Sequence, residues 1–271
     1  MIAQFALRLI CGMSLMWALM PRRQVTSGFF RIQMLVVLGL GVLAALTMEH
    51  NEDSRPDYLP AGVESGLSVA IAGAGFLGSV LWTLERRVAG EWIGFLLLAL
   101  SAGMVLSMNL TDAVLRAHWW HWSVWMRPVS DLAGAAVLGG TAVGMLLGHW
   151  YLTSPTMSIA PLQRINLFLG IAGLGRLALS SGAMLCLWTE RLSADKIGSE
   201  LPGLMSVPTA WLGLRWLAGV IGPLVVSLMV WRILKYRNTQ AATGVLFVGV
   251  ILAFIGDMTA ALLLRETTLP L

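Results

Sequence analysis

The sequence contains few charged residues and few cysteines. Only 12% of its 271 residues are Asp, Glu, Lys or Arg, whereas a soluble domain usually carries about 25%. Its two cysteines, Cys11 and Cys186, have neither CxxC nor CxxCH spacing, so no iron–sulfur, c-type haem or zinc-finger signal is present. We expect both to be small buried hydrophobic residues. The chain also lacks P-loop, HExxH and GxSxG motifs, so nothing indicates an ATP-driven pump or a hydrolase.

Apolar residues dominate instead. They make up 57% of the chain, and the mean hydropathy is +0.78. They fall in eight runs of about 20 residues, the length that crosses a bilayer core of about 30 Å. The runs are 2–20, 29–48, 64–84, 92–110, 131–152, 165–188, 209–231 and 241–264. The first run carries Arg8 and is followed by "PRRQ", so we interpret it as a retained helix rather than a signal peptide. The sequence predicts an all-α, polytopic transmembrane helical bundle.

The basic residues of the connecting loops predict an orientation. Nine of them occupy one set of loops: Arg22, Arg23, Arg31, Arg86, Arg87, Arg164, Arg232, Lys235 and Arg237. The opposite loops carry six, together with most of the acids. The positive-inside rule then places the nine-residue side in the cytoplasm and both termini outside. We expect a multi-pass protein of a bacterial-type inner (plasma) membrane, whose net charge of +4 reflects topology rather than nucleic-acid binding.

Matches between the two halves indicate an internal duplication. "GMSLMWALMP" begins at Gly12 and "GMLLGHWYLTSP" at Gly144, an offset of 132 residues. "RIQ" at residue 31 matches "RIN" at residue 164, and Trp82 aligns with Trp231. The order of the matches predicts two parallel four-helix repeats, 1–128 and 129–271, within one membrane domain. The alternative is that Leu-, Gly- and Ala-rich segments align by composition alone.

The segment GHWYLTSP (148–155) is where the two halves differ most. His149 and Tyr151 stand where the first half has Trp17 and Leu19. A quinone site needs a polar group for each carbonyl and an apolar slot. His149 and Tyr151 at the predicted cytoplasmic end, with Arg164 close by, could supply the polar groups. The alternative is a belt of interfacial residues.

Charged residues within the apolar runs are a second candidate site, because such residues normally face the bundle interior and find partners. Arg176 and Asp257 lie deep in their runs, and pairing Asp257 with Arg176 or Arg215 is the simplest arrangement. Arg8 and Arg215 fall early in runs that enter from outside, so both could extend toward that surface. These charges form either a structural ion pair or a proton or substrate pathway.

Three histidines are candidates for a metal or haem site on the outer side. His118 and His121 are three residues apart in "RAHWWHWSVWMRP", and His50 lies near the end of the second run. A b-type haem usually takes two axial histidines from different helices. The alternative is an interfacial amphipathic helix whose tryptophans lie at headgroup level.

Two features together resemble a known family. The eight-run architecture and the late pattern "GVIGPLVV…GVILAFIGD…LLLR" resemble the membrane anchors of polysulfide and DMSO reductase-type complexes. The resemblance implies exchange of electrons or protons with membrane quinone and docking of an iron–sulfur or other redox subunit. It carries no site residue over to this chain.

Three functions are therefore open. The first is a membrane subunit of a redox complex that binds quinone or a b-type haem, and is a quinone-reacting or non-catalytic subunit rather than a complete enzyme. The second is a small-molecule or ion transporter or channel. Against it, Pro223 in the seventh run has no counterpart in the third, whereas transport sites usually interrupt matching helices. The third is a membrane scaffold or assembly protein.

Overall fold

The computed structural model describes residues 1–48, 62–108, 122–154, 156–194 and 209–267. Over these ranges the chain is helical and contains no strand. The first four long helices are α1 (Ile2–Leu19), α2 (Ser27–Met48), α3 (Val63–Thr83) and α4 (Arg87–Ser107), with a short 3-10 turn, η1 (Arg22–Gln24), before α2. The later helices are α6 (Trp122–Thr153), α7 (Ala160–Ala194), α8 (Thr209–Trp216), η3 (Leu217–Ile221), α9 (Gly222–Lys235) and α10 (Thr239–Thr267).

The prediction of a polytopic helical membrane protein is confirmed. Eight of the described helical segments are long and apolar enough to cross a membrane, with α8, η3 and α9 forming one of them. The helices extend beyond two of the predicted runs, since α6 begins at Trp122 and α7 ends at Ala194. Large apolar side chains such as Leu46, Phe76 and Leu167 are exposed on the outer helix faces, as expected for surfaces that face lipid rather than water.

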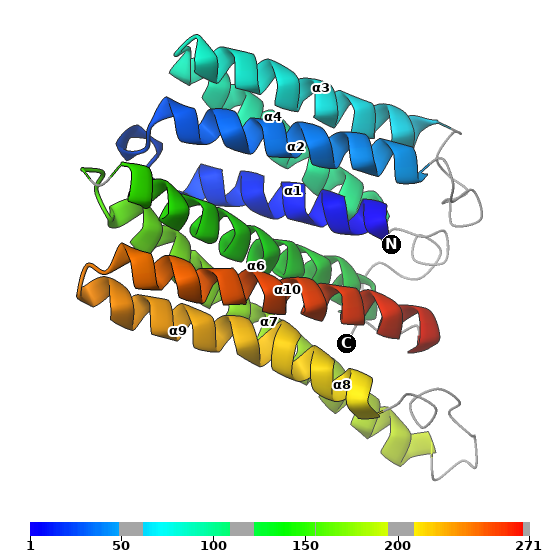
Figure 1. Ribbon diagram of the computed structural model, residues 1–271. Coiled ribbons are helices and arrows are strands. Elements are labelled where there is room, and N and C mark those ends of the chain that lie inside the picture. The colour runs from blue at the N-terminus through cyan, green and yellow to red at the C-terminus, as the bar shows by residue number, and fades with distance from the viewer. Residues whose placement is uncertain (49–61, 109–121, 155, 195–208, 268–271) are drawn as a thin grey trace.

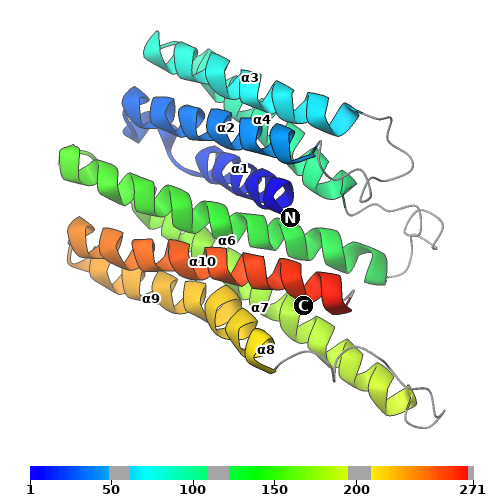
Figure 2. The ribbon, with the colours of Figure 1, turned by 45° about the vertical axis from the view of Figure 1, so that its right-hand side comes forward.

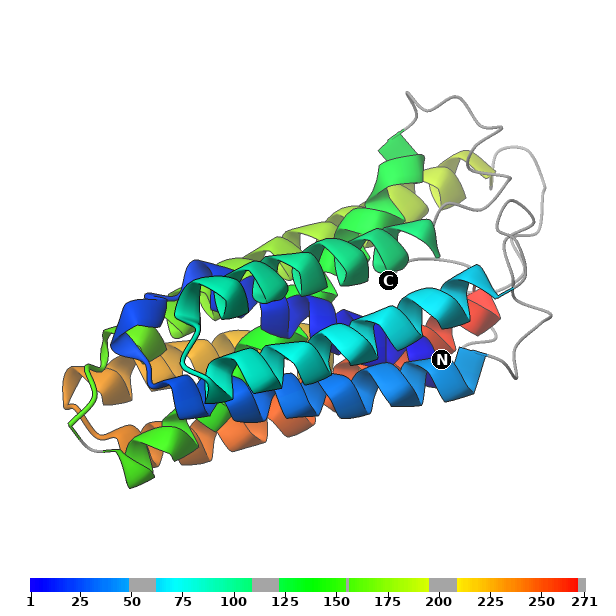
Figure 3. The same cartoon turned by 90° about the horizontal axis from the view of Figure 1, so that it is seen from above.

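The helices form two groups that lie side by side (Figure 1). In the first group α1 contacts α2 and α4, and α3 contacts the same two helices. In the second, α6 contacts α7 and α10, and α9 contacts the same two. The start of α1 and the end of α10 lie at one end of the bundle, here named the terminal end. The short connections 20–26, 84–86 and 236–238 lie at the opposite end, here named the short-loop end (Figure 3).

Helix α1 joins the two groups by packing against α6 (Figure 2). The two backbones touch where they cross: a Cβ on Gly12 would collide with the carbonyl oxygen of Ala135, and one on Gly139 with the backbone of Gly12. Small residues at such crossings allow close van der Waals packing, which drives helix association in lipid. The α1–α6 crossing therefore holds the two groups together.

The seventh span contains a π-helical segment. Between α8 and α9, the five residues of η3 adopt a π-helix, which ends one residue before Gly222 and Pro223. Proline has no backbone N–H and its ring clashes with the carbonyl of the residue four positions earlier. A π-helical turn accommodates that clash by widening the helix. The third span, α3, is a regular α-helix, so it has no matching π-helical segment.

The duplication stays a prediction. Both groups have the same pattern of helix contacts, but any antiparallel four-helix bundle with short connections acquires that pattern. Two repeats, 1–128 and 129–271, would produce this contact pattern, but so would two unrelated four-helix bundles.

Candidate functional site

Arg8 of α1 lies at the centre of a charged cluster inside the bundle. Its guanidinium forms an ion pair of 2.7 Å with Asp131 of α6 and a second of 3.2 Å with Asp257 of α10. The second Oδ atom of Asp257 also accepts a hydrogen bond from Arg8, at 3.5 Å. One guanidinium therefore bridges two carboxylates, and the bridge joins the first helix group to the second.

The cluster lies in the half of the bundle nearer the terminal end. Arg8 is six residues beyond the start of α1 at Ile2, or about 9 Å along the helix axis. Asp257 lies six residues before Leu263, the last residue of its apolar span. The side chain of Asp131 is 16% exposed and that of Asp257 only 4%. Asp131 is thus the outer and Asp257 the inner carboxylate.

Arg176 of α7 extends the cluster. One terminal guanidinium nitrogen donates to the backbone oxygen of Ser130 at 3.3 Å, next to Asp131. A Cβ on Gly134 would collide with this same nitrogen, so the glycine makes room for the guanidinium against α6. The buried Nε of Arg176 has no hydrogen-bond partner within the described part of the chain. Arg176 is attracted electrostatically by Asp257 and repelled by Arg8.

Arg215 completes the cluster from α8. Its side chain is among the largest that are fully buried, and the residue is 1% exposed. It lies two residues before the π-helical segment, and it interacts electrostatically with Arg176 and Asp257. The cluster thus gathers charges from five helices: Arg8, Asp131, Arg176, Arg215 and Asp257.

Two sequence predictions about these charges are wrong. Arg8 and Arg215 do not extend to the outer surface, since they are 6% and 1% exposed. Their spans place both side chains on inward-facing helix surfaces, where carboxylates can compensate the charge of Arg8. The closest cationic partner of Asp257 is Arg8 rather than Arg176 or Arg215. Sequence reasoning did bring Arg176, Arg215 and Asp257 into one candidate site, but it missed Arg8 and Asp131 as members.

The chemistry available to this cluster is proton exchange. Arginine stays protonated under all ordinary conditions, whereas a carboxylate can accept a proton and lose its charge. Protonating either aspartate would remove one of the two attractions that hold Arg8. Because Arg8 belongs to one helix group and both aspartates to the other, that change acts on the contact between the groups.

The residues predicted at GHWYLTSP have separate environments. Tyr151 is 3% exposed, and its hydroxyl donates a short hydrogen bond to the backbone oxygen of Ser158. The Trp150 indole donates to Thr26 Oγ1 at 2.8 Å, which ties the two helix groups at the short-loop end. His149 is exposed, and the structure gives it no hydrogen bond or ion pair with any described residue.

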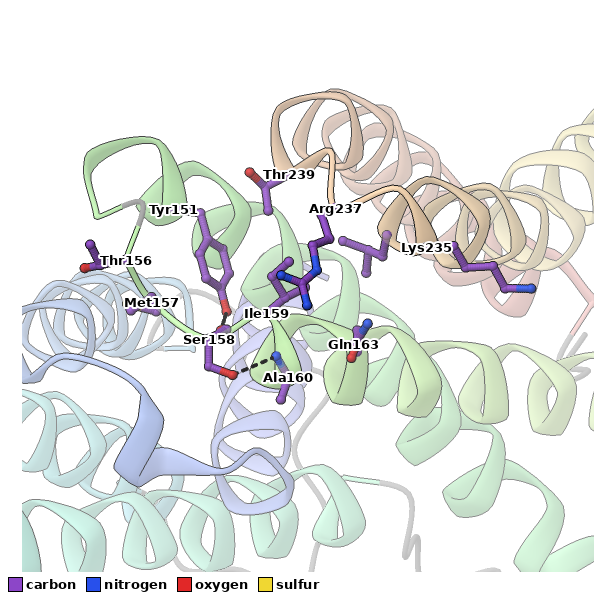
Figure 4. Close-up of a pocket in the computed structure, with 11 residues that line it drawn as sticks. Tyr151, Thr156, Met157, Ser158, Ile159, Ala160, Gln163, Lys235, Arg237 and Thr239 are labelled. Atoms are coloured by element: carbon purple, nitrogen blue, oxygen red, sulfur yellow. Dashed lines mark hydrogen bonds between the residues drawn. The ribbon is translucent and has the colours of Figure 1, made fainter.

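Arg164 is also exposed on the first turns of α7. It is not among the residues that line the cavity beside Tyr151, and neither is His149. This cavity, of about 690 Å³, opens at the short-loop end between the 156–160 segment and the α9–α10 connection (Figure 4). Its other polar lining residues include Gln163 and Arg237, which sequence reasoning did not select. The sequence places Gln163 and Arg237 near the ends of apolar runs, but it does not show that both line the same cavity.

The histidines predicted for a metal or haem site, His50, His118 and His121, lie outside the described residues. Over the ranges that the structure does describe, no three His, Cys, Asp or Glu side chains are grouped as metal ligands. Comparison of the chain with known protein families, with curated proteins and with solved structures finds no match.

Proposed function

We propose that this integral membrane protein is a proton-coupled transporter whose intramembrane carboxylates are Asp131 and Asp257. The observation that carries the proposal is the bridge from Arg8 to both aspartates across the contact between the two helix groups. Buried ionisable residues within membrane spans mark ion and proton pathways in many transporters. Coupling-ion sites commonly lie between the two structural halves of a transporter.

The π-helical segment of the seventh span supports a functional role for the adjacent charges, because π-helical turns occur often at functional sites. Here the π-helical segment 217–221 follows Arg215 of the charged cluster. The π-helical segment thus lies next to the charged cluster, which favours a functional site over a scaffold whose charges only pair helices.

The proposed sequence of events uses only these residues. A proton from water at the terminal end reaches Asp131, the more exposed carboxylate, and passes inward to Asp257. Each protonation neutralises one partner of Arg8 and weakens the attraction between α1 and the second group. The groups then rearrange, Asp257 releases the proton toward the short-loop end, and its ion pair with Arg8 forms again. Protonation is thus coupled to the arrangement of the two helix groups, because it favours one of two states of the contact between them.

A quinone-interacting redox subunit, the first function that the sequence suggested, remains a second candidate. Its support is Tyr151, whose side chain lines the cavity at the short-loop end. An optical spectrum and a quinone extraction of the purified protein test it directly. A haem Soret band or co-purifying quinone would favour the redox subunit over the transporter.

The test of the transporter is proton flux into proteoliposomes under an imposed pH gradient and membrane potential. Wild-type protein should acidify the lumen faster than protein-free liposomes. Asp257→Asn should reduce the flux to the protein-free level, because an amide does not exchange a proton with the pathway. The matched control is Glu91→Gln, which neutralises the carboxylate of the surface ion pair between Arg22 and Glu91 and should retain wild-type flux.

Flux equal in wild-type protein and Asp257→Asn would overturn the proposal. So would equal loss in Asp257→Asn and Glu91→Gln, because the effect would then not belong to the cluster.

A further inference from the structure

The cavity at the short-loop end is built from four separate parts of the second helix group. Tyr151 ends α6, Gln163 lies in the first turn of α7, and Arg237 lies in the connection between α9 and α10. Residues 156–160 close the remaining side. Figure 4 shows Arg237 reaching from the α9–α10 connection toward the first turn of α7. The cavity of about 690 Å³ is large enough for a small polar group with part of the chain attached to it.

The cavity lining is cationic and rich in hydrogen-bond donors. Arg237 supplies a planar guanidinium, and Gln163, Ser158 and Thr239 supply amide and hydroxyl groups. No Asp or Glu is among the described residues that line it. The amino end of α7 also faces this region, and helix amino ends favour negative charge. An anion is the ligand class that such a lining attracts.

Arg237 occupies a backbone conformation that disfavours an arginine. Its φ is +54°, in the left-handed region where glycine is the usual residue at a helix end. The backbone N–H of Arg237 donates to the Leu234 carbonyl at 3.1 Å, which fixes this conformation. The neighbouring Lys235 places its ammonium 3.7 Å from the centre of the Trp231 ring. Arg237 is therefore the cation that remains directed at the cavity.

The corresponding end of the first helix group is closed. Trp17, Phe30 and Trp82 fill the space between its helices, which leaves a void of only about 10 Å³. Its cation, Arg22, is paired with Glu91 at 3.6 Å. Side chains fill the short-loop end of the first helix group. The open cavity at the same end of the second group is therefore not a general consequence of the four-helix arrangement.

We infer that the cavity binds a phosphate-bearing anion, held by the Arg237 guanidinium and by Gln163. A guanidinium matches two phosphate oxygens at once, which makes arginine the preferred residue for this contact. The phosphate is the headgroup of an anionic lipid or a soluble phosphate compound, because the cavity opens where the spans end. This site is separate from the charged cluster and does not depend on the proposed transport function.

Two binding measurements on the full-length protein in neutral detergent test the inference and distinguish the sources of phosphate. Native mass spectrometry measures retention of added phosphatidylglycerol against phosphatidylcholine. Isothermal titration calorimetry measures binding of inorganic phosphate and glycerol 3-phosphate. Selective retention of phosphatidylglycerol identifies a lipid headgroup site, and calorimetric binding of the soluble phosphates identifies a soluble ligand.

The decisive variant is Arg237→Gly. It removes the guanidinium and places the residue best suited to the left-handed conformation at that position, so the fold is retained. Binding should weaken by about 10- to 100-fold, the loss typical of a charged hydrogen-bonding partner. The matched control is Glu85→Gly, which changes the left-handed residue after α3, with φ +57°, and should leave binding unchanged.

Absence of selective binding to any of the three phosphate probes would overturn the inference. Binding that is equal in wild-type protein and Arg237→Gly would overturn it too. So would a loss in Glu85→Gly as large as that in Arg237→Gly, because the effect would then arise from the helix ends in general.

Discussion

At the level of single residues, the stability of the charged cluster depends on whether each buried charge has a partner of opposite sign. Arg8 has two carboxylate partners, whereas the ion pair of Asp257 rests on Arg8 alone among the described residues. Removing one member of a buried pair leaves the other uncompensated, which costs more than the pair itself contributes. Substituting Asp257 leaves Asp131 as the one carboxylate among the three arginines of the cluster, so buried positive charge is left uncompensated.

Asp257→Leu should lower the free energy of unfolding by about 3–5 kcal/mol, the cost typical of orphaning a buried charge. Arg8→Met should also destabilise, because it leaves both aspartates without their shared cation. The double variant Arg8→Met/Asp257→Leu should lose less than the sum of the two single losses, since the contact is already absent in each. Thermal or denaturant unfolding in detergent measures this cycle, and additive losses would show that the two residues do not interact.

The sequence identified Arg176, Arg215 and Asp257 as interior charges because each interrupts an apolar run. It could not identify the partner of Asp257, since 249 residues separate Asp257 from Arg8. Hydropathy reports how long a span is but not which face of the helix points inward. With both arginines early in their spans, extension to the surface was the simpler expectation, and the rotation of α1 and α8 decided otherwise.

At the scale of helices, the approach of α1 to α6 positions Arg8 against both aspartates. The crossing at Gly12 and Gly139 lies one turn from Arg8 along α1. Close packing there aligns the charged faces of the two groups. The lengths of the eight spans were predictable from their apolar runs. The crossing was not, because many glycines in this chain have similar apolar neighbours in the sequence.

Gly139→Leu should destabilise the protein by at least about 1–3 kcal/mol, the cost typical of overpacking, because its side chain would meet the backbone of α1. The control is Gly175→Leu on α7, where an added Cβ meets nothing within 4 Å and should be tolerated. The midpoint of thermal unfolding in detergent compares the two. Equal midpoints for both variants would contradict the close crossing.

At the scale of the whole molecule, the predicted orientation decides which side supplies protons and which ligands reach the cavity. The nine basic loop residues predict that the short-loop end lies in the cytoplasm. The charged cluster, nearer the terminal end, would then receive protons from outside. The cavity of Tyr151 and Arg237 would face the cytoplasm and the inner leaflet.

Cysteine labelling in intact cells tests this orientation. In a background with Cys11 and Cys186 replaced by serine, Asn238→Cys should resist a membrane-impermeant maleimide until the cells are opened. A cysteine placed before Met1 should react in intact cells. The opposite labelling pattern would reverse the orientation and the expected direction of proton entry.

The proposed transport requires Asp257 to change its protonation state within an intact fold. Infrared difference spectroscopy of the reconstituted protein, recorded between high and low pH, measures this change through the carboxyl C=O stretch. We expect a band of protonated carboxyl that appears at low pH and is lost or reduced in Asp257→Asn, while Glu91→Gln leaves it in place. If Asp257→Asn retained the whole band, Asp257 would not be the group that takes up the proton.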